Sequence, residues 1–123
     1  MNYTQLTKRE SQVMDILWKH DKKMSANDIK LASDGLSIYT ISQVLQYLLS
    51  IGYIEVTGIG KNKKSIARLY SPSISESEYV SSFIKKETCE EIAVHYIQNS
   101  NDISEITKLE QLIEKKKKEL AGK

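Results

Sequence analysis

The order of hydrophobic patterns in the first part of the chain restricts its fold more than any other feature of the sequence. Apolar residues recur at helical spacing in three short stretches, residues 7–20, 25–32 and 37–51. They then alternate with polar residues in two stretches, 53–57 and 65–70, which is typical of β-strands. The sequence therefore predicts a mainly helical fold with one small β-hairpin.

Capping residues indicate where these helices begin and end. Thr7 with Glu10 has the spacing of a capping box, in which each side chain bonds the other residue's free backbone N–H. Ser25 with Asp28 predicts a second N-cap. Gly52 follows the third helical stretch, where a left-handed residue is expected to end the helix.

The third helical stretch has one face of unusual chemistry. This face is polar but uncharged, whereas a solvated helix face of this length normally carries several lysines or glutamates. Amides, hydroxyls and aromatic tips are hydrogen-bonding groups suited to reading another molecule. The residues of this stretch expected to do so are Tyr39, Thr40, Ser42, Gln43, Gln46 and Tyr47.

The strand pair encloses a glycine-rich turn, residues 58–64, with a basic tip. Charge is uneven along the chain: residues 1–74 contain ten Lys and Arg against six Asp and Glu, whereas residues 75–123 contain eight against ten. A polyanion would therefore bind the first part. The expected phosphate contacts are Lys61, Lys63, Lys64 and Arg68.

Three helices followed by a basic hairpin is the order of a winged helix-turn-helix, which is a DNA-binding architecture. A helix of about 10 Å diameter fits the major groove, where Gln43 and Gln46 would each address adenine or a phosphate. The basic tip would contact backbone phosphates beside that groove and so position the domain. We expect this DNA-binding domain to span residues 1–74, ending at the turn 71–73.

Residues 75–123 are expected to be helical to the end, with Ser75–Glu78 and Asp102–Glu105 as caps and a turn at 99–101. So few residues do not bury a sizeable core alone, and their apolar stripes require another surface, most simply a second copy. We therefore expect a homodimer held by a domain of residues 75–123. Its expected contact residues are Tyr79, Phe83, Ile92, Tyr96, Ile106, Leu109, Leu112 and Ile113.

Composition and motifs exclude several other classes. The chain has no apolar run near the ~20 residues of a membrane span and no signal-peptide pattern, and its single cysteine, Cys89, fits a reducing cytoplasm. His20 and His95 have no metal-ligand partner at helical spacing, so no metal or other cofactor is expected. The sequence contains no phosphate-binding loop, metalloprotease motif or hydrolase motif, so we expect that the protein is not an enzyme.

Several motifs also carry a family resemblance. The most specific is the opening Leu6-Thr7-Lys8-Arg9-Glu10-Ser11-Gln12-Val13-Met14-Asp15-Ile16-Leu17-Trp18. Others are Ser25-Ala26-Asn27-Asp28-Ile29, Thr40-Ile41, Leu48 with Gly52-Tyr53-Ile54, Tyr70-Ser71-Pro72 and Ile103-Ser104-Glu105-Ile106. In these motifs the chain resembles, over nearly its whole length, the penicillinase repressor (BlaI/MecI) family of bacterial winged-helix regulators.

The resemblance implies a homodimeric transcriptional repressor that binds an operator and blocks expression of resistance or copper-handling genes. Since two-fold symmetry in the protein is mirrored in the site, we expect a pseudo-palindromic operator. The family's recognition helix usually carries basic residues where this chain has Tyr39, Ser42 and Tyr47, so its operator sequence is not transferable. A sensor-pathway protease cuts penicillinase repressors at an Asn-Phe bond, which aligns here with His95–Tyr96. Copper-responsive relatives use paired cysteines, and a single sulfur does not make a selective Cu(I) site.

A second interpretation of the sequence assigns the protein to a different functional class. Winged helices also serve as protein-interaction modules, and Tyr39 and Tyr47 are of a residue type enriched at protein interfaces. The uncharged face of the third helix favours this alternative, whereas the basic hairpin tip and the family resemblance favour DNA. Salt dependence of binding separates the two, because phosphate binding releases counterions.

Overall fold

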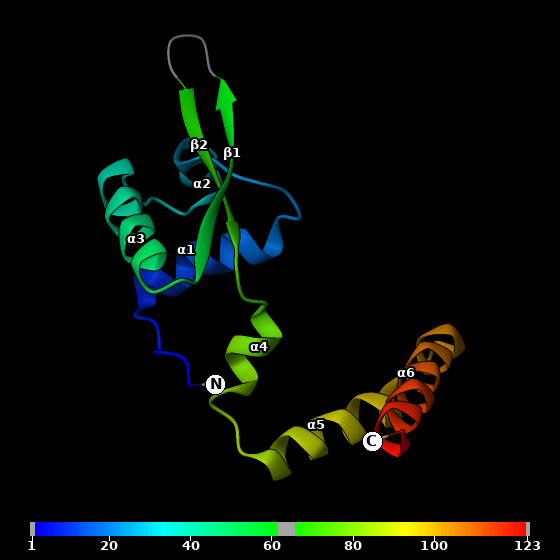
Figure 1. Ribbon diagram of the computed structural model, residues 1–123. Helices are drawn as coiled ribbons and strands as arrows, with labels where there is room; N and C mark the ends of the chain where they lie inside the picture. Colours follow the sequence, from blue (N-terminus) through cyan, green and yellow to red (C-terminus); the bar gives the residue numbers. More distant parts are fainter. Residues whose placement is uncertain (1, 62–65, 123) are drawn as a thin grey trace. The chain divides into compact units, whose positions relative to one another are not determined.

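The computed structural model describes residues 2–61 and 66–122, which fall into two compact units, Met1–Phe83 and Ile84–Lys123 (Figure 1). Within the described residues, the first unit has a two-stranded antiparallel hairpin after three helices, followed by one short helix, and the second unit has two helices. The predicted mainly helical fold with a winged helix-turn-helix order is thus confirmed. The elements are α1 (Lys8–Lys19), α2 (Ala26–Ala32), α3 (Ile38–Ser50), β1 (Ile54–Lys61), β2 (Ile66–Pro72), α4 (Glu76–Ser81), α5 (Lys86–Asn99) and α6 (Ile103–Ala121).

The hydrophobic core of the first unit lies between α1, α2 and α3, and it includes Tyr53 and Ile54 at the start of the hairpin. The apolar stripes expected from helical spacing on α1 and α3 point into it, since no stripe residue of α3 from Ile41 to Leu48 is more than 8% exposed. Burial of these side chains stabilises the helices more than their intrinsic propensity does. The core consists of Val13, Met14, Leu17, Met24, Ile29, Ile41, Val44, Leu45, Leu48, Tyr53 and Ile54.

The predicted caps of the first two helices are present. The Glu10 backbone N–H donates to the Thr7 hydroxyl, and the Thr7 N–H donates to the Glu10 carboxylate at 2.9 Å, which completes a capping box. Ser25 and Asp28 form the same reciprocal pair on α2. Gly52 has a φ of 79°, the left-handed value expected of the residue that turns the chain from α3 into β1.

The hairpin is longer than predicted, because the residues 58–61 assigned to the turn continue strand β1. The ladder runs from Ile54–Pro72 to Lys61–Ile66, with a register shift between Val56 and Gly58. Glycine suits this extension, since a Cβ at Gly60 would lie only 3.2 Å from the Leu69 side chain, a tight contact. The Leu69 side chain thus lies beside Gly58 and Gly60, two positions of β1 that carry no side chain.

A backbone bridge that the sequence did not indicate ties the α1–α2 loop to the hairpin. The Met24 N–H donates to the Tyr70 carbonyl at 3.0 Å, and the Tyr70 N–H donates back to the Met24 carbonyl at 2.8 Å. Met24 is buried at this point. The bridge fixes the base of the hairpin relative to the helices.

Helix α4 packs against the first unit, so the boundary expected after residue 74 falls inside that unit. The Tyr79 hydroxyl accepts the Leu6 backbone N–H at 2.8 Å, and the Tyr79 ring lies 5.7 Å from Trp18 and 4.9 Å from Phe83. The Trp18 indole N–H donates to the Ile74 carbonyl at 2.9 Å. Residues 71 and 72, assigned to a domain boundary, belong to β2.

A helix cap and a tyrosine hydrogen bond stabilise the segments that pack around α4. The Ser75 backbone N–H donates to the Glu78 carboxylate at 3.1 Å, and this bond holds the pKa of Glu78 below its usual value. The Tyr53 hydroxyl donates to the Thr4 carbonyl at 2.7 Å, and burial raises the pKa of Tyr53. The N-terminal segment, the hairpin base and α4 are therefore fastened together.

The second unit consists of α5 and α6, joined at the predicted turn. Asp102 caps α6 by accepting the Ser104 N–H at 2.9 Å, as expected, but the Glu105 half of the predicted box is not made. The Glu105 carboxylate instead accepts hydrogen bonds from the Ser100 hydroxyl at 2.9 Å and from Tyr96 at 3.3 Å. These bonds connect the end of α5 to the start of α6.

Candidate nucleic-acid interface

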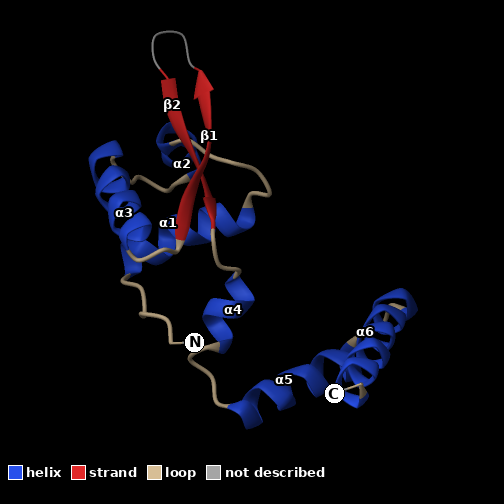
Figure 2. Ribbon diagram, viewed as in Figure 1, coloured by secondary structure: helices blue, strands red, loops and turns tan. Residues whose placement is uncertain are grey.

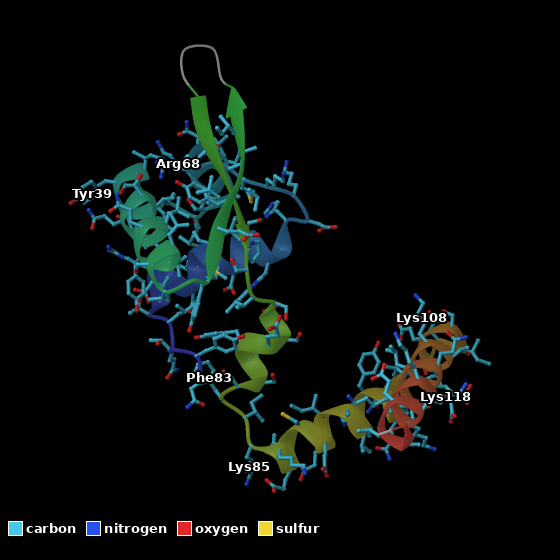
Figure 3. All side chains as sticks on the ribbon, in the orientation of Figure 1. Tyr39, Arg68, Phe83, Lys85, Lys108 and Lys118 are labelled. Carbon is cyan, nitrogen blue, oxygen red and sulfur yellow. The ribbon has the colours of Figure 1, made fainter. Side chains whose placement is uncertain are left out.

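The outer face of α3 is exposed along its length, opposite the buried stripe. Tyr39 projects from the first turn of the helix with 71% of its surface exposed (Figure 3). Ser42, Gln43 and Gln46 are also exposed, and Tyr47 is 37% exposed. The structure therefore brings the predicted reading residues onto one accessible surface, which is the first requirement for contact with a groove of DNA.

Thr40 differs from the other predicted residues of this face, because it takes part in the helix cap. The Ser37 hydroxyl accepts the Thr40 backbone N–H at 3.1 Å and donates to the Thr40 hydroxyl at 3.0 Å. Thr40 is only half-buried, so its hydroxyl keeps some access to solvent. By contrast, in the part of the chain that the structure describes, the Gln43 and Gln46 amides make no hydrogen bond to the protein.

The hairpin supplies the second part of the candidate interface. Arg68 is exposed on β2, opposite Ile59, which is 67% exposed. In the view of Figure 3, Arg68 projects from β2 on the side where α3 lies. Lys61 is the last residue of β1, whereas Lys63 and Lys64, predicted as phosphate contacts, lie outside the described residues.

Lys23 is a basic residue beside the hairpin whose place in this interface is not indicated by its sequence pattern. Its ammonium nitrogen lies 3.6 Å from the position that a Cβ would occupy on Gly58 of β1. The Met24–Tyr70 bridge holds the loop in this place. The sequence predicts only a polar loop between two helices at this point. The bridge itself is not predictable, because a single bridged residue pair leaves no periodic pattern.

The second unit exposes a large amount of apolar surface. Neither α5 nor α6 contains a buried residue. Among the predicted dimer contacts, Ile106 and Leu109 are half-buried within the unit, while Tyr79 packs in the first unit beside the more exposed Phe83. The large apolar residues of α5 and α6 that are more than two-fifths exposed are Ile92, Val94, Tyr96, Ile97, Ile103, Leu112, Ile113 and Leu120.

The candidate cleavage residues His95 and Tyr96 lie inside helix α5. The Tyr96 hydroxyl donates to Glu105 at 3.3 Å, and Asn99 donates to the His95 carbonyl at 2.8 Å. Cleavage of the His95–Tyr96 bond by a protease that binds extended segments would therefore require local unfolding of α5.

The fold and the exposed α3 face define a winged helix-turn-helix protein of the DNA-binding class (Figure 2). None of the described helices is long and apolar enough to cross a bilayer. The penicillinase repressor family matches the chain over residues 6–115, and the protein belongs to that family of DNA-binding transcriptional repressors rather than to an enzyme family. No curated protein sequence matches it significantly.

Proposed function

We propose that the protein represses transcription as a homodimer on a pseudo-palindromic operator, with α3 in the major groove and the hairpin on the flanking backbone. The observation that carries this proposal is the exposed, uncharged, hydrogen-bonding face of α3 on a repressor-family fold. Two-fold symmetry in the protein is mirrored in the half-sites, which places one reading helix in each.

The dimer part of the proposal rests on the apolar surface of α5 and α6. Monomeric soluble proteins rarely expose large apolar surfaces, and a unit of two helices has too little interior to fold stably alone. Ile103 is 83% exposed and Leu112 is 61% exposed. A second copy of the same segment supplies a matching apolar surface without requiring any further partner.

Substitution of the two amides tests the assignment of the reading helix. Gln43→Ala or Gln46→Ala should weaken operator binding by roughly 5- to 100-fold, since each removes a base contact, while binding to a scrambled duplex changes little. The measurement is fluorescence anisotropy of the full-length protein on both duplexes. Gln12→Ala, an exposed glutamine of α1, is the matched control and should leave both affinities unchanged. Equal loss on the two duplexes would contradict the assignment.

Removal of cations tests the assignment of the hairpin. Arg68→Ala should weaken binding to operator and scrambled duplex alike and reduce the slope of log K against log[salt] by about one. Lys63→Ala combined with Lys64→Ala should have the same effect with a larger change in slope. Lys86→Ala, an exposed lysine at the first residue of α5, serves as the control. An unchanged salt slope in the hairpin variants would show that the hairpin does not contact the DNA backbone.

Protein docking by α3 is the competing function, because Tyr39 presents an exposed aromatic ring. Anisotropy between roughly 50 and 200 mM salt separates the two functions. Operator binding predicts a preference of about a thousandfold over scrambled DNA with a steep salt slope. Weak binding with a flat salt response would favour the docking function.

A further inference from the structure

Helix α3 carries no charged residue anywhere between Ile38 and Ser50. Its exposed face has one continuous row in which Tyr39, Gln43, Gln46 and Ser50 follow each other at intervals of four, three and four residues. Because an α-helix has 3.6 residues per turn, these side chains lie along one line of the helix surface. The Ser50 hydroxyl donates to the Tyr47 carbonyl at 2.6 Å, so the available groups of the row are the tyrosine and the two amides.

The chemistry of this row selects among base pairs. In the major groove, guanine presents two acceptors that arginine or lysine reads, and cytosine presents an amino group that a carboxylate reads. Adenine presents one acceptor beside one donor, the pair that the amide of Gln or Asn matches with two hydrogen bonds. Helix α3 has the amides that form this two-bond pairing with adenine, but neither the cations that match guanine nor the carboxylates that match cytosine.

The geometry of the two amides suits neighbouring base pairs. Gln43 and Gln46 are separated by a rise of about 4.5 Å along the helix axis, which is close to the base-pair step of about 3.4 Å. Both are exposed, and in the described part of the chain no hydrogen bond holds either amide in another orientation. They are therefore free to form two bonds each with a base.

Tyr39 adds an apolar contact at the N-terminal end of the same row. Recognition helices contact base edges chiefly with their N-terminal residues, and thymine is the one base that presents a methyl group in the major groove. The Tyr39 ring projects from the first turn of α3 with most of its surface exposed (Figure 3). An aromatic ring so placed is suited to pack on a thymine methyl.

We propose that the base pairs read by α3 are A·T pairs, with Gln43 and Gln46 on neighbouring adenines and Tyr39 against a thymine methyl group. The inference rests on the proposed function and adds the base identity to it. It separates this protein from a regulator that reads guanine through recognition-helix arginines.

The test begins with selection of operator half-sites from a randomised duplex library by the full-length protein. Base analogues then separate the two grooves. Inosine·cytosine in place of A·T presents the guanine edge in the major groove, and it should weaken binding by roughly 5- to 100-fold per pair. Diaminopurine·thymine keeps the adenine edge there and changes only the minor groove, so it should be tolerated. Replacing thymine by uracil removes only the methyl group and should weaken binding a few-fold, an effect that Tyr39→Ser should abolish.

Two variants connect the preference to the residues. Gln43→Ala should lose discrimination between A·T and inosine·cytosine at one position while keeping it at the other. Gln43→Arg should change the preferred pair at that position to G·C. A selected operator with G·C at the positions that α3 contacts would overturn this inference and leave the repressor function intact. Enrichment of no sequence at all would overturn the proposed function itself. Loss of affinity with diaminopurine·thymine but not with inosine·cytosine would show that the minor groove is read instead.

Discussion

Leu112→Glu is expected to convert the dimer into a monomer and to weaken operator binding by about 100-fold or more. Leu112 is 61% exposed on α6, within the apolar surface proposed to meet a second copy. Two-fold symmetry places the new carboxylate twice in an apolar interface, where removing a charge from water costs several kcal/mol. A monomer binds only one half-site, and loss of the linked second site lowers affinity by about 10² to 10⁴.

The substitution is suited to this test because it does not damage the helix. Lys108 and Lys116 lie one turn away on either side, so the carboxylate gains helical ion-pair neighbours. Gln111→Glu is the matched control, since it places the same group at the preceding polar position and should leave the protein dimeric. Analytical ultracentrifugation at micromolar concentration measures the association, and circular dichroism monitors helix content. A variant that stays dimeric with full helix content would place the dimer surface elsewhere.

Tyr79→Ala is expected to destabilise the first unit by about 2 to 4 kcal/mol without changing dimer association. The Tyr79 ring contacts Trp18, Tyr53 and Phe83, and its hydroxyl accepts the Leu6 N–H. The substitution leaves a cavity among these rings and an amide without its acceptor. Had Tyr79 the dimer role that its helical spacing suggested, the same change would weaken association instead.

The chain's single tryptophan makes this effect measurable. Trp18 lies 5.7 Å from the Tyr79 ring, so its fluorescence during denaturation reports on the first unit. Tyr79→Phe keeps the ring contacts and removes only the hydroxyl, so it should cost about 1 to 2 kcal/mol. A Tyr79→Ala protein that unfolds like wild type but dissociates more readily would indicate that Tyr79 lies in the dimer interface.

The local elements of the first unit were predictable because their causes lie close together in the sequence. Capping boxes span four residues, and the buried stripe of α3 repeats at helical spacing, so both can be read without tertiary information. The uncharged exposed face of α3 follows from the same periodicity. Its predicted residues are exposed, apart from the half-buried Thr40, whose hydroxyl also joins the cap.

Salt bridges on α6 were less predictable than the helix itself. A pair of Glu114 with Lys118 would have the favourable spacing of four residues, but the structure pairs Glu114 with Lys117 at 3.9 Å. Both lysines lie within one turn, and exposed ion pairs differ by only a few tenths of a kcal/mol. Spacing therefore identifies the partners of an exposed charge only to within a turn.

By itself, the sequence determined the helices of the first unit, the hairpin, the chemistry of the α3 face and the family. Tertiary structure decided where the first unit ends, how far the hairpin extends and which residues belong to which surface. Tyr79 has helical spacing compatible with a dimer stripe, yet contacts with Leu6 and Trp18 assign it to the first unit. Met24 and Tyr70 are likewise joined by two backbone bonds that leave no sequence pattern. Periodicity indicates that a face is apolar, whereas only contacts between distant segments determine what covers it.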